Sequence, residues 1–191
     1  MTRVKKRFGQ HFLEPAWVAK TITAIAPRPE DLFVEIGPGP GALTRPLSAA
    51  ARRVIAIEVD RDLADALARA SIPHLQVVNR DVLGVDFEAL LADEPAPARV
   101  AGNLPYNISS PILFSLLSAA RDGARFSDAT LMVQKEVADR IAARSGTREY
   151  GVLAVQTSLV ADAELLFTLP PGAFRPPPQD RKSTRLNSSH T

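Results

Sequence analysis

The sequence contains no cysteine, and this absence excludes several kinds of chemistry. Without thiols the chain has no disulfide framework, no thiolate zinc site and no cysteine nucleophile. The three histidines, His11, His74 and His190, are too scattered to suggest a metal cluster, so we expect no bound metal. The lack of cysteine also fits a reducing compartment, and we expect a cytoplasmic protein.

Long hydrophobic runs are missing too. No segment approaches the roughly 20 apolar residues of a membrane span, and no apolar core follows the basic start MTRVKKRFGQHFL as it would in a signal peptide. Of the 191 residues, 46% are hydrophobic and 23% are charged, which is the composition of a folded, soluble domain. We expect one domain with at most a small appendage.

A general excess of positive charge is also missing, because 23 basic residues stand against 21 acidic ones. This balance argues against a uniformly basic nucleic-acid binder, so contact with a polyanion must come from a local patch. The N-terminus is the candidate, since Arg3, Lys5, Lys6 and Arg7 meet no acidic residue before Glu14. A solvated arm without a partner explains the same charges equally well.

Short apolar runs alternate with helical patterns, which is typical of βαβ units that build a parallel sheet. The pattern predicts strands at 32–36, 54–57, 75–78, 99–101, 129–133 and 164–169. It predicts helices at 16–26, 43–50, 61–70, 87–92, 112–120, 136–144 and 153–160. The last segment, QDRKSTRLNSSHT at 179–191, has neither periodicity, and we expect it to be disordered or foreign sequence.

The residues of unusual type directly follow the predicted strands. The glycine-rich loop 37–41 follows the first strand, Glu58 the second, Asp81 the third and the segment 103–106 the fourth. The carboxyl ends of parallel strands lie along one edge of an open sheet, and ligands bind at that edge. The ordered set therefore predicts one binding site.

The loop that begins at Gly37 lets the backbone turn sharply and lets a ligand approach the main chain closely. Its spacing also satisfies the dinucleotide fingerprint, so the glycines alone fit a nicotinamide cofactor, S-adenosylmethionine or a structural turn. Two features favour S-adenosylmethionine. The carboxylate of Glu35 could help to hold an ammonium group, and Pro40 stiffens the loop instead of starting a phosphate-binding helix.

Glu58 and Asp81 are the acidic residues of this set. Glu58 follows Gly37 by about 20 residues, the distance expected of an acid that hydrogen-bonds ribose hydroxyls. By the same geometry, Asp81 would accept a hydrogen bond from the exocyclic amine of an adenine, with Val82 against the ring. Each also fits a plainer role as a helix cap or a turn residue.

The segment Asn103-Leu104-Pro105-Tyr106 is the most specific element. An exocyclic amine is hard to methylate because its lone pair is delocalised into the ring, so a site must hold both hydrogens and direct the lone pair at the methyl donor. The Asn103 side-chain oxygen and a nearby main-chain carbonyl supply two acceptors. Pro105 keeps Leu104 extended, and Tyr106 offers a face on which a flipped base can stack. A strand-terminating turn would explain the Asn and the Pro but not the Tyr.

Four motifs resemble, in order, those of the ribosomal RNA adenine N6-dimethyltransferases: KRFGQHFL at 6–13, VEIGPG at 34–39, GNLPYNIS at 102–109 and QKEV at 134–137. The resemblance is strongest to the bacterial small-subunit (16S) enzymes whose loss confers kasugamycin resistance. It implies an α/β, Rossmann-like class I methyltransferase fold with a mostly parallel sheet and helices on both faces. It also implies S-adenosylmethionine as methyl donor, dimethylation of two adjacent adenosines near the 3′ end of 16S ribosomal RNA, and a role in subunit maturation.

Residue by residue, the resemblance implies cofactor contacts at His11, Leu13, Gly37, Glu58, Asp81 and Asn103. It implies that Asn103, Leu104, Pro105 and Tyr106 hold the target base, and that Phe174 stacks on the other face of that base. The expected partner is the immature small subunit, contacted by Lys5, Lys6 and Arg7, and we expect the chain to act as a monomer.

The resemblance breaks off after FRPPP at 174–178. In the family this motif continues into a last sheet strand and a small helical C-terminal domain. We therefore expect three parts: a basic arm at 1–14 that contributes to the cofactor site, a catalytic domain at 15–178 without its last strand, and a disordered or non-native tail at 179–191. A missing strand would expose ladder groups, so we expect reduced stability.

Other functions fit parts of this pattern. A large-subunit ribosomal RNA dimethyltransferase of the macrolide-resistance type shares the fold and the chemistry. A non-catalytic ribosome-assembly or RNA-binding protein could keep the same fold. A nicotinamide-dependent oxidoreductase fits the glycine loop alone and leaves the segment 103–106 unexplained.

Overall fold

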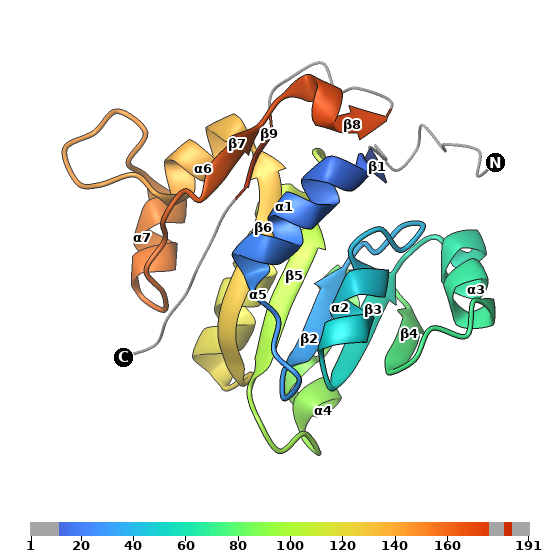
Figure 1. Ribbon diagram of the computed structural model, residues 1–191. Coiled ribbons are helices and arrows are strands. Elements are labelled where there is room, and N and C mark those ends of the chain that lie inside the picture. The colour runs from blue at the N-terminus through green and yellow to red at the C-terminus, as the bar shows by residue number, and fades with distance from the viewer. Residues whose placement is uncertain (1–11, 176–181, 185–191) are drawn as a thin grey trace.

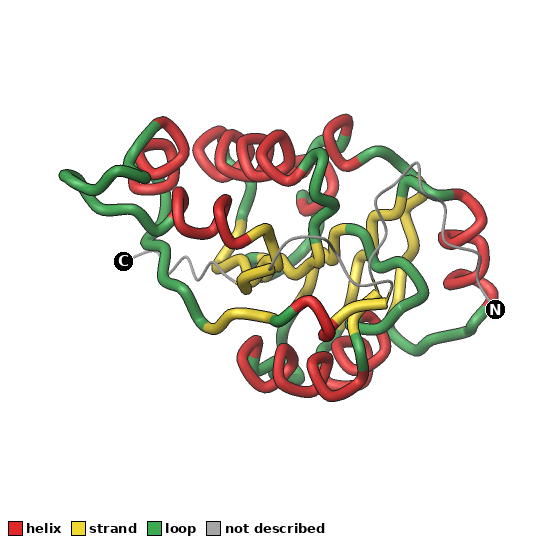
Figure 2. The backbone as a smooth tube through the Cα atoms, turned by 90° about the horizontal axis from the view of Figure 1, so that it is seen from above, coloured by secondary structure: helices red, strands yellow, loops and turns green. Residues whose placement is uncertain are grey.

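The computed structural model describes residues 12–175 and 182–184. A seven-stranded sheet lies at the centre, in the order β4-β3-β2-β5-β6-β9-β7, and helices cover both of its faces (Figures 1 and 2). A second, two-stranded sheet pairs β1 (Phe12–Leu13) with β8 (Phe174–Arg175). None of the helices in the described ranges is long and apolar enough to cross a membrane.

Every strand and helix predicted from the sequence is present, with ends that differ by a few residues. The strands are β2 (Leu32–Ile36), β3 (Arg53–Glu58), β4 (Leu75–Asn79), β5 (Ala98–Asn103), β6 (Phe126–Gln134) and β7 (Phe167–Leu169). The helices are α1 (Pro15–Ile25), α2 (Thr44–Ala50), α3 (Arg61–Arg69), α4 (Phe87–Leu91), α5 (Ser109–Asp122), α6 (Lys135–Ile141) and α7 (Val152–Ser158). Strands β2 to β6 pair in parallel, which confirms the predicted α/β class.

The central strands are buried on both faces, which explains their continuous apolar sequences. In β2, Leu32, Val34 and Ile36 belong to the core cluster that includes α4, α5, α6 and α7. Phe33 belongs to the other cluster, with α1 and α2. Side chains alternate between faces along a strand, so two layers of helices can enclose one sheet (Figure 2).

The expectation that the last strand is missing is wrong. Strand β9 (Lys182–Thr184) lies between β6 and β7 and pairs antiparallel with both, with Thr184 opposite Met132 and Phe167. Strand pairing uses main-chain groups, so a polar segment without strand periodicity can fill this position. The expected disordered tail is thereby corrected at 182–184, while 179–181 and 185–191 lie outside the described residues.

Strands β1 and β8 were not predicted, because two residues are too few to show a period. Phe12 pairs with Arg175 and Leu13 with Phe174, so the two ends of the described range 12–175 lie side by side (Figure 1). This pairing places Leu13 beside the carboxyl ends of the central strands.

Gly102 in β5 is required by the close approach of β2. A Cβ at this position would lie 2.6 Å from the backbone oxygen of Ile36, which cannot move without breaking the sheet. We predict that Gly102→Ala lowers the free energy of unfolding by about 1–3 kcal/mol, measured by urea titration. The matched control is Gly84→Ala, where nothing lies within 4 Å of the new Cβ; an equal loss in both variants would contradict this interpretation.

Candidate functional site

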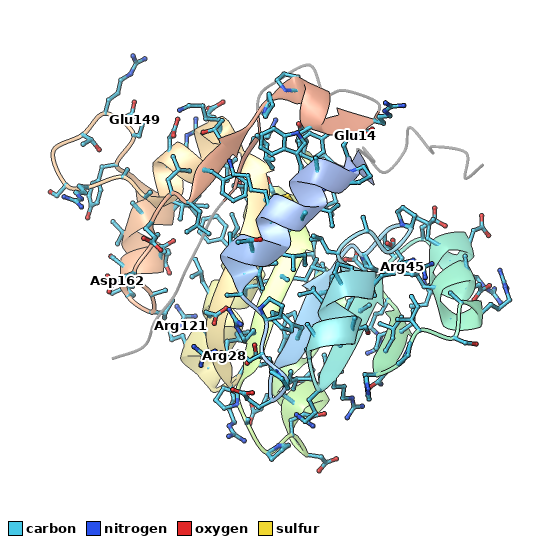
Figure 3. All side chains as sticks on the ribbon, in the orientation of Figure 1. Glu14, Arg28, Arg45, Arg121, Glu149 and Asp162 are labelled. Atoms are coloured by element: carbon cyan, nitrogen blue, oxygen red, sulfur yellow. The ribbon has the colours of Figure 1, made fainter. Side chains whose placement is uncertain are left out.

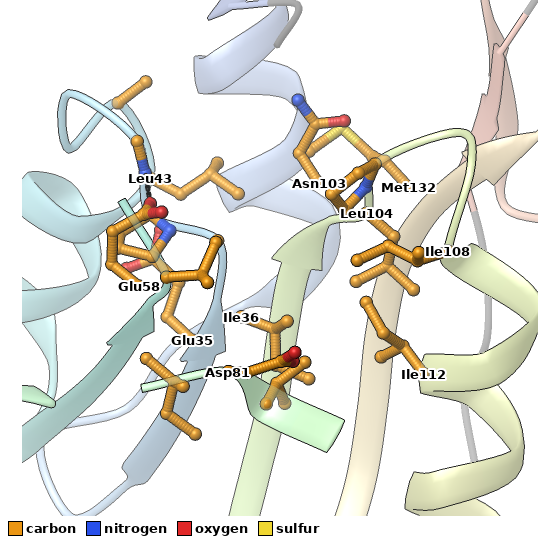
Figure 4. Close-up of a pocket in the computed structure, with 18 of the residues that line it drawn as sticks. Glu35, Ile36, Leu43, Glu58, Asp81, Asn103, Leu104, Ile108, Ile112 and Met132 are labelled. Carbon is orange, nitrogen blue, oxygen red and sulfur yellow. Dashed lines mark hydrogen bonds between the residues drawn. The ribbon is translucent and has the colours of Figure 1, made fainter. Parts of the chain in front are cut away.

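A pocket lies at the carboxyl ends of β2, β3, β4 and β5, as the sequence pattern predicted (Figure 4). Its lining includes residues from all four predicted segments: Gly37, Glu58, Asp81 and Asn103. Leu13 of β1 also lines it. The structure therefore brings together five of the six expected cofactor contacts from distant parts of the chain.

The glycine-rich loop needs its glycines because of its backbone conformation. Gly37 has a φ of 66° and Gly39 a φ of 56°, both in the left-handed region that side chains disfavour. The Gly37 N–H donates to the carbonyl of Ile57 at 3.0 Å, and the Gly39 N–H donates to Oε2 of Glu58 at 3.0 Å. The loop is thus fixed to β3 by one backbone and one side-chain contact.

Glu58 connects the loop to the end of its own strand. Besides the bond from Gly39, its Oε1 accepts a hydrogen bond from the Asp60 N–H at 2.9 Å. Burial raises the pKa of Glu58, and these two N–H donors act in the opposite direction. Each oxygen keeps a further lone pair, so binding of ribose hydroxyls stays a consistent prediction.

Glu35 is the most unusual group in the pocket lining. It is 1% exposed, and among the described residues its Oε2 has no hydrogen-bond partner. Burial raises the pKa of Glu35 to about 8; the Thr44 hydroxyl lowers it and the nearby Glu58 raises it, both by less than burial does. The side chain therefore carries a proton near neutral pH unless a cation is placed beside it.

Asp81 has the plainer of the two roles that the sequence left open, that of a cap. Its Oδ1 accepts a hydrogen bond from the Leu83 N–H at 3.0 Å and so caps the short 3₁₀ turn Val82–Gly84. Asp81 and Val82 nevertheless both line the pocket. The contact to an adenine amine stays a prediction that uses the other oxygen.

The segment 103–106 is tied to β6 by a backbone hydrogen bond at Leu104. Asn103 lies opposite Met132 at the end of the β5–β6 ladder, and the Leu104 N–H donates to the Met132 carbonyl at 3.0 Å. Leu104 is fully buried. Asn103, Leu104 and Pro105 line the pocket, whereas Tyr106 is half-buried and lies outside that lining. Stacking of a base on Tyr106 stays a prediction.

Phe174 is not placed as the resemblance implied. It is 1% exposed and belongs to the core cluster that contains Leu13 and Met132, two pocket residues. As placed, the ring cannot reach a base, so its stacking role stays a prediction that requires a rearrangement. His11, Lys5, Lys6 and Arg7 lie outside the described residues.

The apolar walls of the pocket could not be identified from the sequence. Met132 from β6, Ile108 from the turn before α5 and Ile112 from α5 line it together with Leu43 (Figure 4). In the sequence these residues look like ordinary core positions. No local signal distinguishes an apolar residue that faces a ligand from one that faces other side chains.

The residues of the pocket fit S-adenosylmethionine better than a dinucleotide. The described lining carries three carboxylates, Glu35, Glu58 and Asp81, and a single basic residue, Arg80. Such a site attracts a cation and offers acceptors to hydroxyl and amine groups, but it gives little compensation for a pyrophosphate. The buried Oε2 of Glu35, which has no partner among the described residues, also needs a donor, and an ammonium group provides one.

The sheet order, the glycine loop and the acids at the strand ends define a Rossmann-like class I methyltransferase. A family model described as "Ribosomal RNA adenine dimethylase" matches residues 1–184. The chain belongs to this family.

Individual relatives agree with this assignment. The chain is 49% identical over 176 residues to "Ribosomal RNA small subunit methyltransferase A" of Methylibium petroleiphilum, covering 92% of this chain and 67% of the relative. It is 46% identical over 189 residues to the protein of the same name in Xylella fastidiosa, covering 97% and 70%. The chain thus spans about two thirds of the length of these relatives.

Solved structures show the same fold. A dimethyladenosine transferase from Plasmodium falciparum superposes with a TM-score of 0.79 at 29% identity, covering 94% of this chain and 64% of that one. The 23S rRNA methyltransferase ErmE superposes with a TM-score of 0.78 at 26% identity, covering 94% and 70%.

Glu35 predicts a pH dependence of stability. Its pKa in the folded chain, about 8, lies above the ordinary value of 4.5, so the folded state binds more protons between these two pH values. The stability that this proton contributes is complete below about pH 4.5 and is lost as the pH rises toward 8. We predict that Glu35→Gln makes the free energy of unfolding, measured by urea titration from pH 5 to 8, fall less steeply.

The matched control for this experiment is Glu88→Gln, because Glu88 is an exposed carboxylate on α4. It should leave the pH dependence of the original chain unchanged. Identical slopes for Glu35→Gln and the original chain would show that Glu35 is ionised in the folded state.

Proposed function

We propose that this chain uses S-adenosylmethionine to dimethylate the N6 amines of two adjacent adenosines near the 3′ end of small-subunit (16S) ribosomal RNA, and that it acts during maturation of that subunit. One observation carries the proposal. Asn103, Leu104 and Pro105 line the same pocket as Gly37 and the carboxylates at the strand ends. A group that accepts from an amine therefore lies beside a site suited to a cationic cofactor.

The cofactor, when bound, supplies an electrophilic methyl group on a positively charged sulfur. Glu58 and Asp81 would hold its ribose and its adenine, and Glu35 would lie nearest to its ammonium group. The glycine loop leaves space for this ligand, because Gly37 has no side chain. The hydrogen bond from the Gly39 N–H to Glu58 holds the loop in position. The apolar walls exclude water from the region between cofactor and base.

The residues 103–105 would orient the target amine. The side-chain oxygen of Asn103 and the carbonyl of Leu104 can each accept one hydrogen of the amine, which turns its lone pair toward the methyl group. The hydrogen bond from the Leu104 N–H to the Met132 carbonyl restrains the backbone that carries these two acceptors. A strong base is not needed, since the proton can leave after transfer, so positioning is the main contribution of the protein.

RNA binding extends the proposal beyond the pocket. A polar hollow at the end of β6 is lined by three basic residues, Lys135, Arg140 and Arg148, and by three acidic ones, Glu136, Asp139 and Glu149. Arg148 and the neighbouring Arg144 are exposed, whereas Lys135 is paired with Asp139 and Arg140 with Glu136. We propose that these residues, with Lys5, Lys6 and Arg7, follow RNA phosphates and that the chain acts as a cytoplasmic monomer on the immature subunit.

A second candidate is dimethylation of large-subunit RNA. The superposition on a 23S rRNA methyltransferase favours it, since that structure matches nearly as well as the dimethyladenosine transferase. The substrate RNA discriminates the two activities.

The deciding experiment is transfer of labelled methyl groups from S-adenosylmethionine to small-subunit particles from a strain that lacks the modification. Dimethyladenosine in the small subunit and none in large-subunit RNA would support the proposal; the reverse pattern would support the second candidate. Binding of the cofactor without transfer to either would indicate a non-catalytic RNA-binding protein of the same fold.

Substitutions in the segment 103–106 should abolish transfer. We predict that Asn103→Ala and Tyr106→Ala lower the methylation rate by about 100-fold or more, because a misoriented amine rarely reaches the reactive geometry. The measurement is the initial rate of methyl incorporation, with a thermal melt to show that each variant is folded. The control is Tyr150→Ala, since Tyr150 is 41% exposed and lies outside the pocket lining. Activity retained in both site variants would exclude this site.

The basic arm predicts a salt dependence of RNA affinity. Each phosphate contact contributes a slope of about 0.7–0.9 to the plot of log affinity against log salt concentration. Replacement of Lys5, Lys6 and Arg7 by alanine should therefore flatten this plot, measured by filter binding at several salt concentrations. An unchanged slope would mean that the arm does not contact phosphates.

A further inference from the structure

Leu13 is the one described pocket residue that comes from outside positions 35–132. It is 8% exposed and packs in the core cluster with Met132 and Phe174. Its strand, β1, has only two residues and pairs only with β8 within the described part of the chain. What holds β1 in place therefore decides whether Leu13 lies against the pocket.

Glu14 makes three kinds of contact immediately after Leu13. Its N–H donates to the carbonyl of Ala173 at 2.8 Å, next to β8. Its carbonyl accepts from the N–H groups of Trp17 and Val18, each at 3.0 Å, and so begins α1. Its carboxylate forms an ion pair with Nε of Arg175. One residue thus joins the strand of Leu13 to both α1 and β8, at the place labelled in Figure 3.

Helix α1 is held in place by contacts farther along its length. Its Thr21 and Ile25 are buried, and the ammonium group of Lys20 lies 4.4 Å from the centre of the Phe167 ring in β7. Glu14 is therefore bonded to a helix that is itself packed against the rest of the protein. The contacts to Ala173, Trp17 and Val18 use main-chain atoms of Glu14, so they persist whatever side chain stands at position 14.

The ion pair is consequently the part of this junction that depends on side-chain identity. Both partners reach solvent, with Glu14 29% exposed and Arg175 82% exposed. An exposed pair contributes little to global stability, so removal of the pair should leave the fold intact. It can still bias the position of a two-residue strand whose pairing with β8 consists of only Phe12 opposite Arg175 and Leu13 opposite Phe174.

We propose that Glu14 and Arg175 are positioning residues for the cofactor site. Their ion pair clasps β1 to β8 and thereby holds Leu13 against the pocket, so that the segment after β7 contributes to cofactor affinity although none of its described residues lines the pocket. The inference deepens the proposed function and rests on it.

The test is calorimetric titration of S-adenosylmethionine into the original chain, Glu14→Arg, Arg175→Glu and the double variant that carries both reversals. Each single reversal replaces attraction by repulsion and should weaken cofactor affinity about threefold to tenfold. The double variant restores opposite charges and should recover most of the affinity. Arg121→Glu is the matched control, since Arg121 is an exposed arginine on α5, distant from Glu14 (Figure 3).

Thermal unfolding of the same variants separates positioning from a loss of folding. We expect melting temperatures close to that of the original chain, and in methylation assays a raised KM for the cofactor with little change in kcat. Unchanged affinity in both single reversals would overturn the inference. So would an affinity loss that the double variant does not recover, or one that merely follows the melting temperature.

Failure of the proposed function gives a different result. If the original chain itself does not bind S-adenosylmethionine, the assignment of the pocket is wrong, and the clasp has no cofactor site to support. If the original chain binds and only the variants fail to show the expected pattern, the assignment of the pocket is supported and the positioning role of the Glu14–Arg175 ion pair is excluded.

Discussion

The parallel register of neighbouring strands is the constraint on which the site depends. β2 lies between β3 and β5, with Ile36 opposite both Ile57 and Gly102. The loops that follow these strands therefore begin at the same level, and the Gly39 N–H reaches the Glu58 carboxylate. A slip of one residue would send alternate side chains to the wrong face and break this contact. The absence of a side chain at Gly102 allows β5 to lie close enough for the register to hold.

The pocket brings acidic side chains together where folding alone would not place them. Glu58 is compensated by two backbone N–H groups, but Glu35 has an oxygen without a donor among the described residues. A buried polar group without a partner destabilises the folded chain, and such groups persist mainly at functional sites. A cationic ligand that supplies the missing partner would then gain affinity, because its binding removes the cost of the unpartnered buried oxygen.

The fold and the site were predictable to different degrees. β2 and β3 could be read from the sequence because burial on both faces requires unbroken apolar runs, as in residues 32–36. Glu58 could be placed because strand length and helix length set its distance from Gly37. β9 could not be predicted, since its pairing depends on a gap between β6 and β7 and not on its own residues. The buried position of Phe174 was equally hidden, because it results from packing against Leu13.

The sequence by itself determined the order of strands and helices, the edge at which the pocket lies and the acidic and amide groups that line it. These properties follow from local periodicity and from the rule that parallel strands end at one edge. Tertiary structure alone decided which apolar residues line the pocket, that Glu35 is buried without a full set of partners, and that Glu14 meets Arg175. Each of these depends on segments distant in the chain, whose relative positions no local pattern encodes.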